Sequence, residues 1–296
     1  MKNVEMNHDK PQTENQKPKI CLTIAGLDPS GGAGIIADIK TFSAFGCFAT
    51  AAITSLTFQN TTGVFGAIHQ TAESVRGQVE PIVEDFEIAA LKTGMLPTRE
   101  VIEEVARLVQ THNLKNFVVD PVVRSTSGFD LIDDEALKVL IKKLFPLADI
   151  VTPNLPEAER IAQMKIENEA DIEQAAKIMQ SYGAKNVLIK GGHFEVKSKR
   201  AKVKSKDQIL KTEYRKARDF LFIGDDLHIF EAEWIETTAT HGTGCTLAAA
   251  ITANLTSGKS LLEAVKIAKN FVTGAIKNAT NIGKGHSPIQ IPDFRF

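Results

Sequence analysis

The sequence predicts an α/β protein with a mainly parallel central sheet and helices on both of its faces. Short apolar runs rich in β-branched residues alternate with segments in which apolar residues recur at helical spacing. The expected strands are apolar almost throughout, which indicates strands that are buried on both faces of a sheet. In such sheets ligands bind at the carboxyl ends of the strands, so polar residues directly after a strand are the first functional candidates.

The expected elements alternate along the chain from Ile20 onward. Strands are expected at 20–25, 51–57, 89–93, 116–119, 150–152, 186–190, 220–223 and 227–232. Helices are expected at 33–45, 72–86, 99–112, 134–145, 156–163, 172–182, 244–255 and 260–280. The last two strands flank Gly224-Asp225-Asp226, a sequence typical of hairpin turns, and we expect them near an edge of the sheet.

Composition limits the classes of protein that the chain can represent. With 296 residues, of which 43% are hydrophobic, the chain can form one large domain, expected over residues 19–296. Residues 1–18 are polar, and we expect a disordered extension rather than a signal peptide. The net charge of -1 and the lack of any bilayer-length apolar run argue against nucleic acid and membrane partners. Three cysteines without metal-type spacing fit free thiols in the cytoplasm.

One segment, residues 195–218, breaks the alternation. It holds ten Lys or Arg residues against three acidic residues. A solvated basic excursion on the surface of the domain explains this charge best. An acidic partner is the alternative, whereas nucleic acid is not expected because aromatic residues for stacking are nearly absent.

The segment from Thr240 to Cys245 has the pattern of an anion-binding turn. Its two glycines allow close approach of the backbone, and an alanine-rich segment that should be helical follows. Unpaired N–H groups at a helix start attract negative charge, so Gly242, Thr243 and Gly244 are candidates for binding phosphate. A thiol at a helix start is expected to have a lowered pKa, which makes Cys245 a candidate proton acceptor. The alternative is an ordinary helix entry with a buried cysteine.

Polar and glycine-rich segments follow the first two strands. Gly26–Gly34 contains four glycines, which implies close approach of the backbone to a ligand or a tightly packed turn. Gln59 and Asn60 end the second strand and offer side-chain amides, which suit the edge of a heteroaromatic ring. The alternative there is an Asx turn at Asn60.

Acids and a lysine follow later strands. A carboxylate at Asp120 can hold a metal ion or its water. Asn154 and Glu157 are explained by helix capping alone, unless Glu157 shares a crevice with Asp120. Lys190 precedes two glycines and suits a phosphate tail, as Lys284 does less specifically. Together with the anion-binding turn, this set fits phosphoryl transfer, in which catalysis is mainly positioning and charge neutralisation.

Two nucleotide-binding motifs are matched only in part. Ala253–Ser260 resembles a phosphate-binding loop, but it lies between two expected helices and has alanine in place of the first glycine. Gly32–Ala37 fits the dinucleotide pattern, but no acid ends the second strand to hold a ribose. An oxidoreductase is therefore disfavoured.

Several of these segments, taken in order, carry a resemblance to a known family. They are Leu22–Gly26, Asp28–Ile35, Ala37-Asp38, Lys40–Ala44, Gln59–Thr61, Lys92, Gly94–Leu96, Asp120–Val122, Thr152–Glu159, Lys190–His193 and Thr240–Thr246. In them the chain resembles the hydroxymethylpyrimidine/phosphomethylpyrimidine kinases of thiamine biosynthesis, in the ribokinase-like superfamily. The resemblance implies a ribokinase-like three-layer sandwich and a homodimer.

The resemblance also implies a reaction and an acceptor pocket. ATP would phosphorylate 4-amino-5-hydroxymethyl-2-methylpyrimidine, and then its monophosphate to the diphosphate. Gln59 matches the glutamine that reads the pyrimidine. Further positions that match the lining of this pocket are Gly26, Asp38, Met95 and Val122.

The remaining matches concern phosphoryl transfer. Cys245 stands where sugar kinases of the superfamily carry an aspartate base, and Gly242–Gly244 match the anion hole. Asp120 and Glu157 match positions that hold Mg²⁺. The residues assigned to ATP are Lys190, Asn154 and Lys284.

Two alternatives stay open. A pyridoxal or pyridoxine kinase shares the scaffold and the Gly-Thr-Gly-Cys ending. A pyrimidine-binding sensor without turnover is the alternative outside the enzymes, although the intact set of charged residues argues against it. Leu27, Phe58 and Ala239 depart from the residues usual in the family, and on a strand Phe58 should point away from Gln59.

Overall fold

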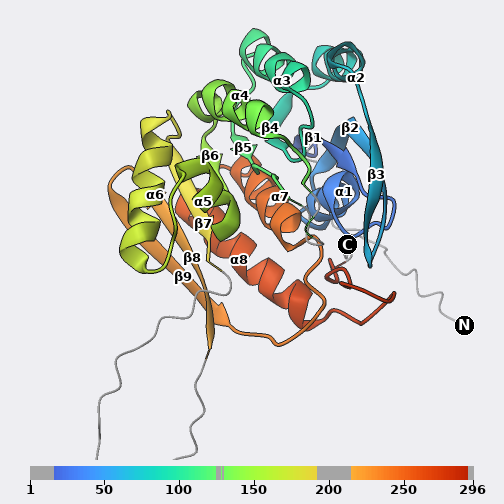
Figure 1. The fold of residues 1–296 in the computed structure, drawn as a ribbon. Coiled ribbons are helices and arrows are strands. Elements are labelled where there is room, and N and C mark those ends of the chain that lie inside the picture. The colour runs from blue at the N-terminus through green and yellow to red at the C-terminus, as the bar shows by residue number, and fades with distance from the viewer. Residues whose placement is uncertain (1–16, 125–127, 129, 192–214, 293–296) are drawn as a thin grey trace, which may run out of the picture.

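Nine strands form one sheet in the computed structural model, which describes residues 17–124, 128, 130–191 and 215–292 (Figure 1). Their spatial order is β3-β2-β1-β4-β5-β6-β7-β8-β9. The strands are β1 (Ile20–Leu27), β2 (Phe48–Asn60), β3 (Gly63–His69), β4 (Ile88–Thr93), β5 (Phe117–Val119), β6 (Ile150–Val151), β7 (Asn186–Lys190), β8 (Lys216–Ile223) and β9 (Asp226–Glu233).

The sheet is parallel over its centre and antiparallel at both edges. Strands β2, β1, β4, β5, β6 and β7 are parallel, whereas β3, β8 and β9 pair with their neighbours in antiparallel register. The predicted mainly parallel sheet is confirmed, and so is the hairpin at its edge. The sequence prediction missed β3, because its two glycines weaken the strand pattern.

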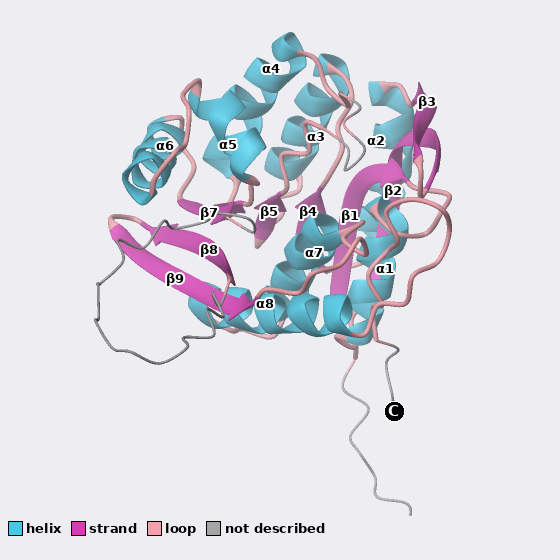
Figure 2. Ribbon diagram, turned by 60° about the horizontal axis from the view of Figure 1, so that its bottom comes forward, coloured by secondary structure: helices cyan, strands magenta, loops and turns pink. Residues whose placement is uncertain are grey.

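Helices cover both faces of the sheet, as Figures 1 and 2 show. Helices α1, α7 and α8 lie on one face, and α2 to α6 lie on the other. The fold therefore has the three predicted layers. The helices are α1 (Gly34–Ala44), α2 (Ala72–Asp85), α3 (Arg99–Thr111), α4 (Asp134–Leu144), α5 (Leu155–Ala162), α6 (Glu169–Ser181), α7 (Thr243–Thr256) and α8 (Leu261–Lys277), with a short 3₁₀ helix at Phe145–Leu147.

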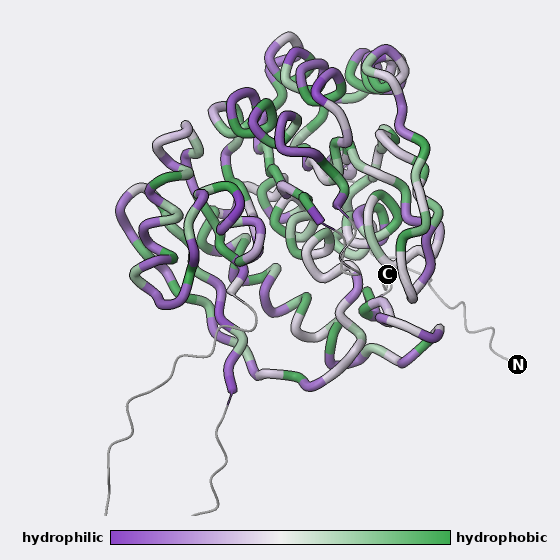
Figure 3. The backbone as a smooth tube through the Cα atoms, in the orientation of Figure 1, coloured by the Kyte–Doolittle hydropathy of each residue, from purple (hydrophilic) through white to green (hydrophobic). Residues whose placement is uncertain are grey.

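The outer helices are amphipathic. In α3 the buried residues Val101, Ile102, Val105 and Leu108 recur at helical spacing and pack into the core on that side of the sheet. Figure 3 shows hydrophobic and hydrophilic residues alternating around α3 and α4. Thr98 begins α3 by accepting a hydrogen bond from the Val101 N–H at 3.3 Å. Burial of the apolar side thus sets how each outer helix faces the sheet.

Strand β2 changes the side on which its residues are buried. Its pairing with β1 skips Thr54, so one extra residue is inserted at that point. The buried residues are Thr50, Ala52 and Thr54 in the first part of the strand. Beyond Thr54 they are Ser55 and Thr57, whereas Phe58 is 51% exposed. Gln59 consequently shares the side of Thr57, and Phe58 points away, as predicted.

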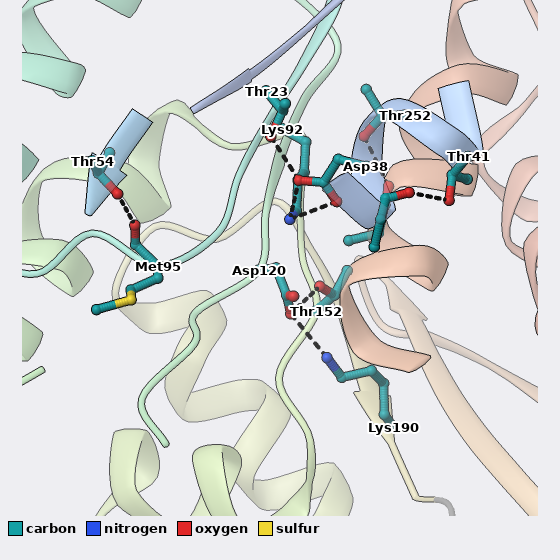
Figure 4. Close-up of polar contacts among 12 residues, drawn as sticks. Thr23, Asp38, Thr41, Thr54, Lys92, Met95, Asp120, Thr152, Lys190 and Thr252 are labelled. Atoms are coloured by element: carbon teal, nitrogen blue, oxygen red, sulfur yellow. Dashed lines mark hydrogen bonds and ion pairs between the residues drawn. The ribbon is translucent and has the colours of Figure 1, made fainter. Parts of the chain in front are cut away.

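A fully buried ion pair joins β4 to α1 (Figure 4). Lys92 Nζ donates to both carboxylate oxygens of Asp38, at 3.0 and 2.9 Å, and Thr23 Oγ1 donates to Asp38 Oδ2 at 2.7 Å. Neither charged side chain is exposed to solvent. Burial would lower the pKa of Lys92, but Asp38 and other nearby acidic groups raise it above its ordinary value. The ammonium group therefore stays charged inside the protein.

Two sequence predictions lie mostly outside the described residues. The extension expected over 1–18 is described only at 17 and 18, and the basic excursion only from Arg215 onward. Arg218, at the end of that excursion, forms ion pairs with Glu231 at 2.8 Å and Glu169 at 3.0 Å. Across the described ranges, no helix combines the length and apolarity that a membrane span requires.

Replacing Lys92 with methionine leaves the Asp38 carboxylate buried without its cation. We expect the free energy of unfolding to fall by about 3–5 kcal/mol, the usual cost of removing one partner of a buried ion pair. The double variant K92M/D38N removes both charges and should recover most of the loss. Urea titration measures all three proteins, with Arg99→Met, which removes an exposed pair to Glu103, as the control. A loss in K92M no larger than in R99M would contradict this prediction.

Candidate active site

A cavity of about 810 Å³ lies along the carboxyl ends of the parallel strands. Its lining runs from the end of β2 across the sheet to β8 and β9, and includes residues of α7 and α8. This is the place where ligands bind in open α/β sheets. The predicted site residues that line it are Gly26, Gln59, Met95, Asp120, Val122, Asn154, Glu157, Lys190, Gly242, Thr243, Gly244 and Cys245.

Two predicted site residues do not line the cavity. Asp38 was expected in the substrate pocket, but its carboxylate is fully buried and bonded to Lys92 and Thr23. Lys284 was expected at the nucleotide, but it lies in a loop packed on the β2–β3 turn, where its N–H donates to Thr61 Oγ1 at 3.2 Å. Neither side chain lines the cavity, because that of Asp38 is held inside the protein and Lys284 is exposed in its loop, so these two assignments are corrected.

The anion-binding turn is built by close packing of two backbones. Gly242 has a φ of +83°, and a Cβ there would lie 1.8 Å from the carbonyl oxygen of Gly32. Only glycine meets both conditions. Helix α7 starts directly afterwards at Thr243, and the Thr246 N–H donates to Gly242 O at 2.9 Å. The first N–H groups of α7 have no partner within the helix and start at the cavity wall, which suits a phosphate.

A lysine and an aspartate lie beside this turn (Figure 4). Lys190 Nζ donates to Asp120 Oδ1 at 2.9 Å, and Thr152 Oγ1 donates to the same oxygen at 3.1 Å. A Cβ on Gly244 would lie 3.2 Å from Lys190 Nζ and 3.9 Å from Asp120 Oδ2, so turn, cation and carboxylate meet at one point. Burial would lower the pKa of Lys190, but Asp120 and Glu157 raise it, so the lysine is charged.

Glu157 is fixed by the start of α5. Its N–H donates to Asn154 Oδ1 at 2.9 Å, and the Asn154 N–H donates to Glu157 Oε2 at 2.8 Å, which forms a capping box. The predicted capping is confirmed. Burial raises the pKa of Glu157 to about 7, against the opposing charge of Lys190. Because both capping residues also line the cavity, capping holds them in place there.

Cys245 lies in the first turn of α7. Burial raises the pKa of its thiol to about 11, although the Lys92 charge and the Gly34 N–H favour the thiolate. The predicted lowering of this pKa is therefore wrong. The free-energy cost of removing a thiolate from water exceeds the stabilisation that the helix start, the Lys92 charge and the Gly34 N–H provide. Without ligand the thiol is neutral at pH 7.

The part of the cavity near β1 and β2 combines an amide with apolar walls. Gln59 lines it together with Met95 and Val122. A Cβ on Gly26 would lie 3.0 Å from Met95 Sδ, so the glycine leaves room for the methionine. Thr54 Oγ1 donates to the Met95 carbonyl at 2.6 Å and fixes the segment after β4 (Figure 4). The composition of these walls suits a small planar ring.

The three residues that depart from the family pattern lie in different surroundings. Leu27 lines the cavity, Phe58 is exposed on the other side of β2, and Ala239 is fully buried. Asn60 forms the Asx turn that was its alternative interpretation, with its Oδ1 accepting from the Thr62 N–H at 2.8 Å. Of these four residues, only Leu27 can touch a ligand in the cavity.

Sequence comparison decides the family. The profile described as phosphomethylpyrimidine kinase matches residues 28–290. The chain belongs to the phosphomethylpyrimidine kinase family. It is 43% identical over 271 residues to a hydroxymethylpyrimidine/phosphomethylpyrimidine kinase of Haemophilus influenzae, which covers 91% of this chain and 95% of the relative.

Solved structures agree with this membership of the phosphomethylpyrimidine kinase family. A phosphomethylpyrimidine kinase from Clostridium difficile is 39% identical with a TM-score of 0.72, and the match covers 87% of this chain and 99% of that one. A pyridoxal kinase from Staphylococcus aureus, in complex with AMP-PCP and pyridoxal, is 32% identical with a TM-score of 0.81, covering 94% and 95%. The predicted family, fold class and kinase identity are confirmed.

Some charged residues of the kinase cavity received no role from the sequence. Lys269 of α8 donates to Asp219 Oδ2 of β8 at 2.7 Å, and both are buried. His241 Nε2 lies 2.7 Å from Asp28 Oδ2. The sequence did contain a partial signal for the first pair, because Asp219 directly precedes the apolar run Phe220–Ile223 and Lys269 lies in a helix rich in apolar residues. Their pairing depends on the fold and could not be read from the chain.

We expect Gly242→Ala to remove kinase activity and lower the melting temperature, because its Cβ would overlap the Gly32 carbonyl. Gly258→Ala is the matched control: its φ is +71°, but no atom lies within 4 Å of its Cβ. That control should lose only about 1–2 kcal/mol from backbone strain and keep its activity. Thermal unfolding and ATP turnover measure both variants. Equal effects at the two positions would show that the contact with Gly32 is unimportant.

Alkylation tests the state of Cys245. Iodoacetamide reacts with thiolates, so the reaction of Cys245 in the ligand-free protein should be slow at pH 8 and rise through pH 10 to 11. In urea the same thiol should titrate near pH 8.5. Mass spectrometry of the peptide containing Cys245 measures both rates. A midpoint below pH 8.5 in the folded protein would restore the original expectation of an activated thiol.

Proposed function

We propose that this cavity carries out two ATP-dependent phosphorylations in thiamine biosynthesis. The first acceptor is 4-amino-5-hydroxymethyl-2-methylpyrimidine, and the second is its monophosphate. The observation that carries the proposal is the meeting of the Gly242 turn, Lys190 and Asp120 in one cavity with Gln59, in a chain of this kinase family. A turn that can bind phosphate, a paired lysine and an amide that can hydrogen-bond a ring are the parts that a small-molecule kinase requires.

The pyrimidine takes the part of the cavity near β1 and β2. Gln59 hydrogen-bonds the polar edge of the ring, and Met95 and Val122 contact its faces. Gly26 leaves space beside Met95. The hydroxymethyl group then points toward the Gly242 turn, where the phosphoryl group arrives.

The triphosphate of ATP takes the centre of the cavity. The N–H groups at the start of α7 bind its oxygens, and Lys190 neutralises charge beside them. Asn154 lines the same region at the start of α5. The nucleoside takes the part lined by α8 and β9, whose walls include Trp234, Val272 and Ile276. This order along the sheet places donor and acceptor on either side of the Gly242 turn.

The donor set also fits Mg²⁺. Asp120 and Glu157 both line the cavity, and carboxylate oxygens are ligands that Mg²⁺ prefers. Asp120 Oδ1 is used by Lys190 and Thr152, and Oδ2 lies on the side of Gly244. Among the described residues no group of three metal-binding side chains occurs, which suits an ion that is held mainly by water and substrate phosphates. Held by Asp120 and Glu157, Mg²⁺ would neutralise charge on the phosphate oxygens.

Cys245 takes the proton of the acceptor hydroxyl in the first reaction. A neutral thiol cannot accept this proton, and the Cys245 thiol is neutral at pH 7 without ligand. The role therefore requires the thiolate form, which the Lys92 charge and the Gly34 N–H stabilise. The monophosphate is already anionic, so the second reaction needs no base. The two steps therefore place different demands on the same residue.

A homodimer in the cytoplasm fits the surface and the thiols. Strands β2 and β3 expose large apolar side chains at the sheet edge, which is the kind of surface that a second copy covers. All three cysteines are free, which suits a reducing compartment. The exposed apolar residues are Phe48, Leu56, Phe58, Phe65 and Ile68.

Product analysis tests the function directly. The chain is incubated with the pyrimidine, ATP and Mg²⁺, and mass spectrometry counts the phosphates added. Two phosphates support the proposal, and none would indicate a binding protein without turnover. Pyridoxal is assayed in parallel, because the similarity to pyridoxal kinase favours it as a second acceptor. Faster turnover of pyridoxal than of the pyrimidine would reverse the assignment.

We expect Cys245→Ala to slow the first phosphorylation at least about 100-fold, the usual contribution of a general base. The second phosphorylation should slow less than about tenfold. Separate ADP-release assays with the alcohol and the monophosphate measure the two rates. Cys47→Ala, which removes a thiol outside the cavity lining, is the matched control. Equal losses in both steps would contradict a base role confined to the first.

A further inference from the structure

His241 lies in the anion-binding turn, directly before Gly242, and is held by both its side chain and its backbone. Its Nε2 lies 2.7 Å from Asp28 Oδ2. Its N–H donates to the Ser287 carbonyl at 3.2 Å, and its own carbonyl accepts from the Ile289 N–H at 3.3 Å. The side chain is 14% exposed and lines the cavity. The loop after β1, the C-terminal segment and the start of α7 therefore meet at this residue.

The carboxylate that faces His241 is itself fixed by its own loop. Asp28 Oδ1 accepts from the Ser30 N–H at 2.8 Å and from the Ser30 hydroxyl at 2.7 Å. Asp28 Oδ2 accepts from the Gly32 N–H at 3.2 Å and from the Ala33 N–H at 2.9 Å, besides its contact with His241. Asp28 is 2% exposed, so these bonds replace water around the charge.

The bonds to Asp28 decide which nitrogen of His241 carries a proton. Burial alone would raise the pKa of Asp28, but hydrogen bonds from His241 and Ser30 hold that pKa well below its ordinary value. An ionised carboxylate has no proton to donate and can only accept hydrogen bonds. Nε2 of His241 is therefore protonated and donates to Asp28 Oδ2, in a hydrogen bond of the stronger, charge-assisted kind.

The ring of His241 and the Gly242 turn lie against the same glycine. A Cβ on Gly32 would lie 2.4 Å from the His241 ring, and a Cβ on Gly242 would lie 1.8 Å from the Gly32 carbonyl oxygen. The N–H of Gly32 is bonded in turn to Asp28. Release of the His241 side chain from Asp28 would therefore let the turn move relative to Gly32, together with the N–H groups at the start of α7.

We propose that His241 is a positioning residue for phosphoryl transfer, which holds the N–H groups at the start of α7 in place through its hydrogen bond to Asp28. The inference rests on the proposed function. Position matters at such a site, because a displacement of about 1 Å can slow a reaction about 100-fold. The role differs from that of Cys245, which acts on the acceptor hydroxyl of the first reaction, whereas the turn receives the phosphoryl group in both reactions.

The first test removes and then restores the donor that faces Asp28. His241→Leu has no donor, whereas the amide N–H of His241→Gln can still reach the carboxylate. We expect H241L to lower kcat at least about tenfold with both the alcohol and the monophosphate, because the turn is displaced. The KM for the alcohol should stay within about twofold of the wild-type value, since the pocket for the ring is unchanged.

The glutamine variant separates positioning from a general loss of stability. H241Q should recover most of the kcat that H241L loses. Circular dichroism at the assay temperature gives the folded fraction of each variant, so that kcat is expressed per folded enzyme. A kcat in H241Q as low as that in H241L, or a loss in H241L that appears in KM alone, overturns the inference.

A double-mutant cycle tests whether His241 acts through Asp28. Asp28→Asn should also lower kcat, and D28N/H241L should lose clearly less than the product of the two single losses, because both changes break the same bond. Ser30→Ala is the matched control, since it removes a hydroxyl from Asp28 Oδ1 and leaves Oδ2 to His241. S30A should keep kcat. Independent losses in the cycle, or a loss in S30A as large as that in D28N, contradict the inference.

A measurement on the wild type covers the case in which the variants do not fold. NMR of the labelled ring nitrogens should show that the neutral His241 ring carries its proton on Nε2 and that this proton exchanges slowly with water. A neutral ring protonated on Nδ1, or a rapidly exchanging Nε2 proton, overturns the inference. Failure of the proposed function looks different, because the wild type would then phosphorylate neither pyrimidine.

Discussion

The catalytic end of this molecule depends on a contact between two backbones that leaves no room for a side chain. The carbonyl of Gly32 lies where a Cβ of Gly242 would have to be, and a Cβ on Gly32 would lie 2.4 Å from the ring of His241. This contact joins the loop after β1 to the start of α7, two segments more than 200 residues apart in sequence. The anion-binding turn, the reach of His241 to Asp28 and the placement of Cys245 all follow from it.

Charge balance is the second condition that the cavity satisfies. Each of three lysines, of which two are buried and Lys190 is partly buried, has an aspartate within hydrogen-bonding distance, which avoids the cost of an unpaired cation in a poorly solvated site. Two of the pairs line the cavity, where a polyanionic ligand can share their cations, and the third lies behind the wall. Each of these two pairs is thus neutral as a unit and still holds a cation that can attract phosphate. The pairs are Lys190–Asp120, Lys269–Asp219 and Lys92–Asp38.

Most of the sheet and most of the cavity lining could be predicted, because both leave local patterns in the chain. Apolar runs marked the buried strands, and polar residues after them marked the carboxyl ends where Asp120, Glu157 and Lys190 meet. The failures have a common cause. The pKa of Cys245, the inward turn of Asp38 and the loop that carries Lys284 are set by packing against distant segments. A short stretch of sequence gives no information about contacts with such distant segments.

The extra residue at Thr54 has a consequence for how the cavity lining can change. Which of two neighbours, Phe58 or Gln59, faces the cavity is decided four residues upstream by the phase of the strand. Deleting one residue there would present an aromatic ring to the cavity and turn the amide outward, with no change at the binding positions themselves. The side chains presented to the cavity can therefore change through the length of a strand as well as through the identity of its residues, so a comparison of pocket residues alone would overlook such a change.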